Sequence, residues 1–213
     1  MLKNRVRVLL AKAGQTVEAT DIFSDGGLKE LLSLSVGELR GKLIQGYASL
    51  ACELETVIEV AEEEIRERVM VSEEARAVDT IRGFGPLSAL TVVSEIGDIH
   101  RFSRAGKLVS YAGLAPANRQ SANVLRHGHI TKQGSPWLRW ILVEAVQHAM
   151  NAYPKLAKLY RRVVSAQGGR KNAGRIAVAR QLLVSIYHML KRKQAFEPER
   201  IGRQNVEHRK VGA

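Results

Sequence analysis

The stretch from Ser35 to about Ser72 constrains the fold most, because almost nothing in it interrupts a helix. It contains no proline, and after Gly46 it contains no glycine. Apolar or small residues recur at alternating steps of four and three, the spacing of a helix that buries one stripe against a partner helix. We therefore expect a long, coiled-coil-like scaffold helix, whose stripe is covered by an antiparallel hairpin or by a second copy of the chain. The stripe consists of Leu43, Tyr47, Leu50, Leu54, Val57 and Ala61.

Charge is divided unevenly along the chain. Residues 1–100 contain 11 Lys and Arg against 17 Asp and Glu, a net of −6, whereas residues 101–213 contain 22 against 4, a net of +18. Between Arg101 and Lys193 the sequence has a single acidic residue, Glu144. So steep an asymmetry indicates an acidic scaffold followed by a polyanion-binding half. Nucleic acid is the leading partner, and an acidic protein or a membrane surface are the alternatives.

Length and composition favour one good core in a reducing compartment. The chain has 213 residues, of which 45% are hydrophobic, and its single Cys52 cannot form an internal disulfide. A cytoplasmic location follows from this cysteine usage. No apolar run approaches the roughly 20 residues that span a bilayer, so we expect no membrane partner. The histidines and Cys52 lack the spacing of a zinc site, and no metal ligand is assigned.

A glycine-rich turn, with the sequence Ile81-Arg82-Gly83-Phe84-Gly85-Pro86, has the pattern of a helix-hairpin-helix. Gly83 and Gly85 let the backbone take left-handed angles and approach a ligand closely. Pro86 begins the following helix at the position where its missing N–H is harmless. The amides at this helix start are expected to face outward and bind a phosphate, which makes Gly83 and Gly85 candidate DNA-binding residues. Alternatively, the turn simply joins two packed helices.

The segment from Leu114 to Gly134 shows no periodicity and is predicted to be a long irregular loop. Compact domains rarely keep such a loop unless it is functional. Ser121 lies in its middle, among several basic residues. These are Arg119, Arg126, His127, His129 and Lys132.

Helices are expected on both sides of a second basic turn in the C-terminal part of the chain. The first begins at Ser135, an N-cap followed by proline. Trp137 is predicted to join its core stripe, although Trp137 and Trp140 could instead stack on bases. Gly168–Arg175 is a basic turn before a last core helix, in which Arg175 and Arg180 are candidates for phosphate contact.

The expected organisation has four parts. Residues 1–34 link to a preceding domain, residues 35–78 form the scaffold helix, residues 79–192 form the DNA-binding serine domain, and residues 193–213 form a flexible basic tail. The expected fold is thus mainly α: a scaffold helix and a compact helical domain with a helix-hairpin-helix and an irregular serine-containing loop.

An ordered series of short motifs resembles the C-terminal part of transposases of the IS110 family, which includes IS116 and IS902. The resemblance runs from about Leu2 to Leu190, and its specificity lies in the order of the motifs. They are IRGFGPLSA at 81–89, EIGDI at 95–99, SYAGLAP at 110–116, QS at 120–121, GHITKQGS at 128–135 and WLRW at 137–140.

The resemblance implies that this part of the protein supplies a serine nucleophile for DNA transposition. Ser121 matches that serine, although Ala122 and Asn123 stand where family members often have glycines. A serine hydroxyl needs a base or a metal to activate it and cations to stabilise the transition state. Expected DNA-binding cations are Arg119, Arg126, Lys132 and Arg139, and the candidate bases are His127 and His129.

The resemblance also implies what lies outside this chain. Full-length family members begin with a resolvase-like domain whose Asp-Glu-Asp-Asp set binds Mg²⁺, and Met1–Gly14 resembles the helix that follows it. We therefore expect a C-terminal fragment that binds no cofactor itself, depends on Mg²⁺ through the missing domain and is inactive alone. Expected partners are DNA, a structured guide RNA and a second copy bound through residues 35–78.

Three functions remain open on the sequence. The leading one is a transposase fragment whose Ser121 attacks a DNA phosphate. The second is a non-catalytic DNA-binding and oligomerising remnant, or an inhibitor of an intact transposase. The third is a helix-hairpin-helix architectural or repair protein.

Overall fold

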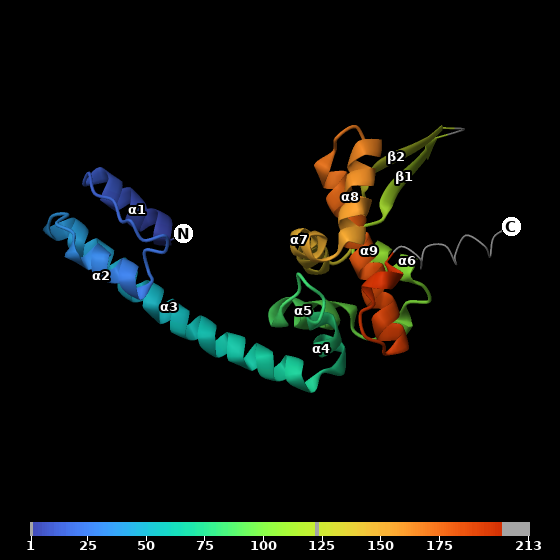
Figure 1. Cartoon of the computed structure of the whole chain (residues 1–213), viewed down its shortest axis with the longest axis horizontal. Coiled ribbons are helices and arrows are strands. Elements are labelled where there is room, and N and C mark those ends of the chain that lie inside the picture. Colours follow the sequence, from blue (N-terminus) through green and yellow to red (C-terminus); the bar gives the residue numbers. More distant parts are fainter. Residues whose placement is uncertain (1, 122–123, 202–213) are drawn as a thin grey trace. The chain divides into compact units, whose positions relative to one another are not determined.

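The computed structural model describes residues 2–121 and 124–201, which are almost entirely helical (Figure 1). The mainly α fold expected from the sequence is confirmed. The chain divides into two compact units, residues 1–64 and residues 65–213, and the division falls inside the long helix α3 (Glu38–Val71). In the described part, every helix is too short or too polar to cross a bilayer.

The N-terminal unit consists of α1 (Leu2–Lys12), α2 (Asp25–Ser33) and most of α3. Helix α2 begins at its N-cap Ser24, whose Oγ accepts a hydrogen bond from the Gly27 amide at 3.2 Å. The three helices enclose a small core. Its buried residues are Val6, Leu10, Ile22, Phe23, Leu31, Val36, Ile44 and Ala48.

Helix α3 confirms the expected scaffold helix but leaves most of its apolar stripe uncovered. Leu50 and Leu54 are 43% and 47% exposed, and Val57 is 65% exposed. The helix ends at Val71, where Ser72 caps a separate short helix, α4 (Glu73–Asp79), by accepting a hydrogen bond from the Ala75 amide.

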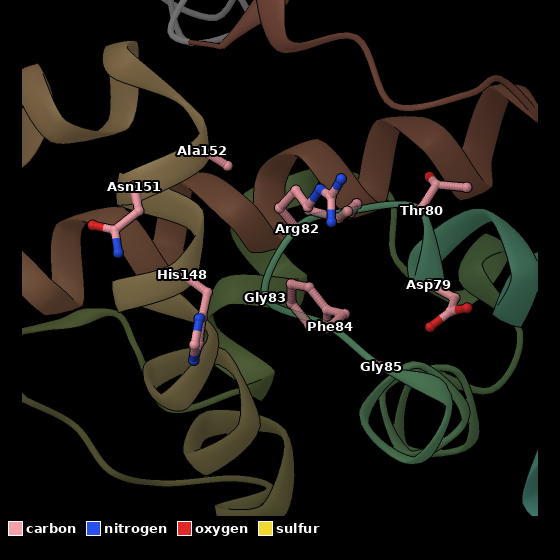
Figure 2. A pocket seen from close by; sticks show the side chains of 10 residues that line it. Asp79, Thr80, Arg82, Gly83, Phe84, Gly85, His148, Asn151 and Ala152 are labelled. Carbon is pink, nitrogen blue, oxygen red and sulfur yellow. The ribbon is translucent and has the colours of Figure 1, made fainter.

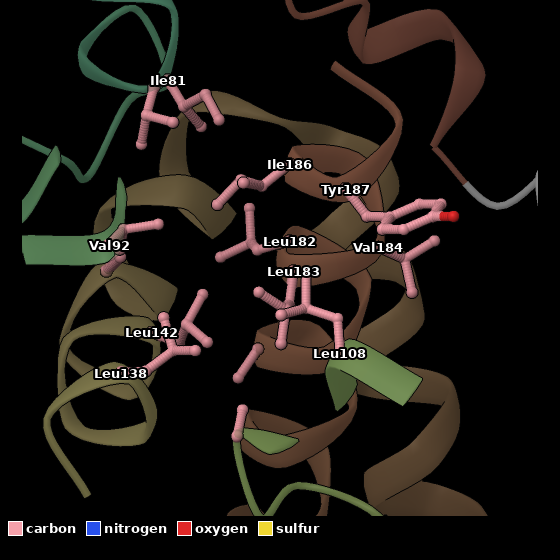
Figure 3. Close-up of a cluster of buried hydrophobic side chains, with 14 of the residues drawn as sticks. Ile81, Val92, Leu108, Leu138, Leu142, Leu182, Leu183, Val184, Ile186 and Tyr187 are labelled. Atoms are coloured by element: carbon pink, nitrogen blue, oxygen red, sulfur yellow. The ribbon is translucent and has the colours of Figure 1, made fainter. Parts of the chain in front are cut away.

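The C-terminal unit, called the helical domain below, is built around its last long helix. Helix α9 buries side chains on nearly all of its sides, and Leu182, Leu183 and Ile186 lie in the middle of the core (Figure 3). Each fully buried side chain of this size stabilises the fold by about 1.5–3 kcal/mol. The elements of the domain after α4 are α5 (Pro86–Ile96), a 3₁₀ turn (Ile99–Arg101), α6 (Ala105–Tyr111), α7 (Pro136–Ala152), α8 (Pro154–Ala166), α9 (Lys171–Arg192) and a second 3₁₀ turn (Pro198–Arg200).

Helix α7 begins as predicted and corrects one predicted core residue. Ser135 is its N-cap, and the Ser135 Oγ accepts a hydrogen bond from the Leu138 amide at 3.0 Å. The prediction that Trp137 is a core residue is wrong, because Trp137 is 60% exposed and Trp140 is 53% exposed. Successive residues of a helix are about 100° apart, and the stripe that packs on α9 contains Leu138 and Leu142, which leaves both tryptophans on its flank. Their rings pack edge to face with 6.1 Å between the centroids.

The segment around Ser121 is a second correction. The irregular loop predicted for Leu114–Gly134 instead contains two antiparallel strands, β1 (Pro116–Ser121) and β2 (Val124–Ile130), which project from the helices as a ribbon (Figure 1). Apolar and polar residues alternate along a strand when one face of the strand is buried and the other is exposed. Residues 116–130 lack that alternation, so the pairing left no periodic signal.

The predicted flexible tail does not begin at Lys193. Phe196 packs edge to face on Tyr153, with 5.1 Å between the ring centroids, and Ile201 is buried in the core. Lys155 forms an ion pair with Glu199 at 3.7 Å. Residues 202–213 of the predicted tail lie outside the described residues.

Candidate nucleic-acid interface

The glycine turn between α4 and α5 is shaped by contact with α7. Gly83 has a φ of +106°, a region that L side chains rarely adopt. A Cβ added to Gly83 would lie 2.6 Å from the Ala145 carbonyl oxygen. Gly83 is therefore required both for the backbone conformation and for the close approach of the turn to α7.

Most of the described amides of this turn have partners inside the protein. The Arg82 amide donates to the Tyr153 hydroxyl at 2.9 Å, and the Phe84 amide donates to the Ile81 carbonyl at 3.0 Å. The Gly85 amide donates to the Ser88 Oγ at 2.8 Å. These three amides precede α5, so the prediction that the amides at the start of α5 face outward stays a prediction. The turn joins two packed helices, and a DNA contact at Gly83 and Gly85 stays a prediction.

An open groove of about 740 Å³ lies beside the glycine turn (Figure 2). One side of the groove is formed by the turn, including the exposed Arg82, and the other by His148 and Asn151 near the end of α7. The sequence analysis missed these two α7 residues. Their signal was their i, i+3 spacing on the outer face of α7, since Ala145 and Ala149 mark its inner face.

The register of the ribbon places Ser121 together with two of the predicted cations. Arg119 is the Cα partner of Arg126, and Ser121 is the partner of Val124. Positions two apart on a strand, and positions directly opposite on paired strands, share a face of the ribbon. Positions 119, 121 and 126 therefore lie on one face, whereas His127, the partner of Asn118, lies on the other face.

Lys132 and Arg139 tie the base of the ribbon to the helices. The Lys132 amide donates to the Gly113 carbonyl at 3.2 Å. The Arg139 Nη1 donates to the carbonyls of Ala112 at 3.2 Å and Lys132 at 3.3 Å. Arg139 is half-buried and has a structural role, and its contact with DNA stays a prediction, as does that of the exposed Lys132.

Arg180 forms a hydrogen bond to the other side of the ribbon base. Its Nε donates to the Leu114 carbonyl at 2.6 Å. Burial lowers the pKa of Arg180 below its ordinary value. An arginine remains charged under such conditions, so this side chain donates a charge-assisted hydrogen bond to the ribbon base. The phosphate contact considered for Arg180 has no support in this arrangement.

The described residues do not provide a Mg²⁺ site. Across residues 2–121 and 124–201, no three His, Cys, Asp or Glu side chains gather into a group that could hold a metal ion. Carboxylate oxygens are the ligands that Mg²⁺ uses in proteins. The resemblance assigns the Mg²⁺ ligands to a separate acidic domain, and that assignment stays a prediction.

Comparison with known proteins links part of the helical domain to transposases. Residues 75–161 match the model described as the transposase IS116/IS110/IS902 family. This is the family that the ordered motifs resemble.

Several curated proteins are similar to this chain over part of its length. The insertion element IS116 protein of Streptomyces clavuligerus is 29% identical over 163 residues, which are 76% of this chain and 41% of the relative. The transposase for insertion sequence element IS1111A of Coxiella burnetii is 29% identical over 139 residues, 63% of this chain and 38% of the relative. The pilin gene-inverting protein of Moraxella bovis is 32% identical over 125 residues, 58% of this chain and 38% of the relative. The chain spans about two fifths of the length of these relatives.

Proposed function

We propose that this chain binds DNA and supplies Ser121 as the nucleophile for strand cleavage and exchange in DNA transposition. The observation that carries the proposal is the ribbon register, which places position 121 on the same face as positions 119 and 126. The ribbon lies within the region that matches the transposase family. The charge of residues 101–213 suits a polyanionic substrate.

The arginine pair supports an anionic ligand at this face. Like charges at directly opposed positions of paired strands destabilise the pairing. We propose that a DNA phosphate binds at the face of positions 119 and 126, on which position 121 also lies. The same two cations would stabilise the charge that develops on the phosphate in the transition state.

The proposed step balances as a transesterification. The Ser121 Oγ forms a bond to phosphorus, and one bond from phosphorus to a deoxyribose oxygen breaks. The serine proton passes to a base, and the departing sugar oxygen takes up a proton to become a hydroxyl. Position 127 lies on the opposite face from position 121, and we propose that the Mg²⁺-binding acidic set comes from outside the described residues.

The test is covalent capture of element-end DNA. The chain is incubated with labelled DNA, Mg²⁺ and a separately expressed acidic domain from a full-length relative, and protein-linked DNA is resolved on a denaturing gel. We expect an adduct with the unaltered chain and with Ser94→Ala, an exposed serine on α5, but none with Ser121→Ala.

Two outcomes would overturn this function. An adduct that persists in Ser121→Ala excludes Ser121 as the nucleophile. No adduct with the unaltered chain, while the full-length relative forms one, leaves a DNA-binding remnant or an inhibitor of an intact transposase. A structured guide RNA is a further proposed partner, and competition between labelled RNA and DNA for the same chain tests it.

We also propose that α3 associates with a second copy of the chain. Leu50, Leu54 and Val57 follow one another on its exposed stripe at the spacing of a coiled-coil seam. Size-exclusion chromatography with light scattering should give a dimeric or larger mass for the unaltered chain. Leu50→Lys with Leu54→Lys should give a monomer, whereas Lys12→Gln with Lys29→Gln should not change the mass. An unchanged mass in the leucine variant contradicts the seam.

A further inference from the structure

Six exposed cations cover the turn between α8 and α9 and the helical turns on either side of it. They are called the basic hairpin surface below. No acidic residue occurs anywhere from Ala145 to Phe196. The basic hairpin surface consists of Lys158, Arg161, Arg162, Arg170, Lys171 and Arg175.

These six side chains differ from Lys155, in the first turn of α8. Lys155 forms an ion pair with Glu199 and donates to the Glu199 carbonyl oxygen. No ion pair joins any of the six to a carboxylate within residues 2–121 and 124–201. No described carboxylate therefore compensates their charges, and an anionic ligand would relieve the repulsion between them.

We propose that the basic hairpin surface binds the phosphate backbone of nucleic acid, as a second contact beside the Ser121 ribbon. The ligand class rests on the proposed function. Contacts of this kind position a protein on nucleic acid and do not read its bases.

The hairpin is built as a firm support for these side chains. Gly168 and Gly169 have φ of +62° and +83°, so the chain reverses through two left-handed residues. A Cβ added to Gly174 of α9 would lie 2.6 Å from the Tyr160 ring of α8. The two helices therefore approach closely, which fixes the backbone positions that carry the cations.

The packing of α8 favours nucleic acid over a membrane surface. A helix that lies in a bilayer interface needs a free apolar face to insert. In α8, Leu156 is fully buried, and Leu159 and Tyr160 pack against the core of the helical domain. The apolar face of α8 is thus already covered, and only its charged face is available.

The hairpin and the ribbon rise from the same point of the fold. The hydrogen bond from Arg180 to the Leu114 carbonyl joins α9 to the ribbon base. From Arg180 back to Lys171, α9 extends about 13 Å at 1.5 Å per residue. From Pro116 to Ser121, β1 extends about 17 Å at 3.3 Å per residue. Both extend toward the same side of the helical domain (Figure 1), so a backbone held by the hairpin lies at the same end of the domain as Ser121.

The test measures how binding of a fluorescein-labelled, mixed-sequence DNA duplex to the full chain depends on salt. The variant is Lys158→Gln, Arg161→Gln and Arg162→Gln, which keeps long helix-forming side chains. The matched control removes three charges from the exposed surface of the N-terminal unit, as Lys12→Gln, Lys29→Gln and Arg40→Gln. The slope of log Kobs against log salt is negative, and each lost phosphate contact makes it less steep by about 0.9. The slope of the hairpin variant should therefore be less steep by up to about 2.7.

Control measurements test whether a change in the salt slope is specific to the basic hairpin surface. Circular dichroism melting should show both triple variants folded like the unaltered chain. Arg161→Lys with Arg162→Lys, which keeps both charges, should retain the slope of the unaltered chain. An unchanged slope in the hairpin variant, or an equal loss in the control, overturns the proposal. Vesicles of phosphatidylserine and phosphatidylcholine that bind the unaltered chain but not the hairpin variant, with the duplex slope unchanged, would assign the surface to a membrane instead.

The two proposals fail in different ways. If the salt dependence of binding is weaker in the hairpin variant but the unaltered chain never forms an adduct, the proposal for the basic hairpin surface is supported and that for the Ser121 nucleophile is not. If the hairpin variant keeps its slope and still forms the adduct, Ser121 stands and the basic hairpin surface does not.

Discussion

Helices α3 and α9 are the two longest helices of the described chain, at 34 and 22 residues. They differ in how far their apolar residues are buried. In α9, neighbouring helices of the same domain cover nearly every side, and Leu182 is 1% exposed. In α3, Ile44 and Ala48 are buried in the N-terminal unit, whereas Leu54 is 47% exposed. An apolar stripe on a helix predicts that another element buries it. Whether that element belongs to the same chain depends on the rest of the fold.

The largest expected effect is a difference between equivalent leucine substitutions in these two helices. Leu182→Ala should lower the free energy of unfolding of the helical domain by about 2–5 kcal/mol, because it leaves a cavity in a packed core. Leu54→Ala should change it by less than about 1 kcal/mol at concentrations where the chain is monomeric.

Urea unfolding measures both leucine variants. Trp137 and Trp140 are the only tryptophans of the chain, so their fluorescence reports the helical domain alone, and far-UV circular dichroism reports all helices. Equal losses in the two variants would break the comparison. A loss in Leu54→Ala that grows with protein concentration would sharpen it, because it would show that a second copy covers α3.

An intermediate effect of opposite sign is expected for two glycines. Gly134 has a φ of +115°, and an added Cβ would collide with the Tyr111 carbonyl oxygen. Gly134→Ala should therefore destabilise the helical domain by about 1–3 kcal/mol or more, measured by tryptophan fluorescence in urea. Gly46→Ala, in the open interior of α3, should stabilise the N-terminal unit by about 0.5–1 kcal/mol, measured by circular dichroism. Two losses of similar size would contradict the contrast between an open and a packed site.

The smallest effect is expected at an exposed ion pair of the N-terminal unit. The hydrogen bond from Lys3, at 2.6 Å, and that from the Phe23 amide lower the pKa of the Asp21 carboxyl. A carboxyl with a lowered pKa stabilises the fold above the ordinary aspartate range, and that contribution is lost as the pH falls through its folded value. Asp21→Asn keeps an acceptor for Phe23 but removes the charge.

Thermal melting of the unaltered chain and of Asp21→Asn, followed by circular dichroism, measures this contribution. The unaltered chain should melt slightly higher at neutral pH, and the difference should vanish in acid and shrink in high salt. A difference that persists in acid would contradict a role for the carboxylate charge. The matched control is Asp25→Asn, which is exposed and begins α2.

Much of the local structure could be predicted from the sequence, because its signals act within a few residues. The absence of proline from Ser35 to Ser72 predicted α3, and the Ser135-Pro136 pair predicted the first turn of α7. The ordered motifs predicted the transposase family. Each of these three inferences depended on neighbouring residues or on a fixed order of motifs. None of them requires knowledge of the packing.

The candidate site was predicted less completely. Ser121 was predicted from the family resemblance, and Arg119 and Arg126 from their proximity to it in the sequence. The common face of these three positions follows only from the pairing of β1 with β2. His127 is just as near Ser121 in the sequence, yet the register separates it. The basic turn at Gly168–Arg175 was predicted from the sequence, but the part of the basic hairpin surface on α8 was not, because its exposure depends on which face of α8 packs against the core.

The sequence by itself determined the helical class, the presence of a long helix at α3, the cap of α7, the division of charge and the resemblance to transposases. Only the tertiary structure decided that Trp137 is exposed, that Gly83 packs against α7 and that Arg139 and Arg180 hold the ribbon base. The physical reason is the range of the forces concerned. Helix propensity and capping act over one turn of the backbone, whereas burial, close approach and hydrogen bonding between distant segments depend on which faces the folded chain brings together.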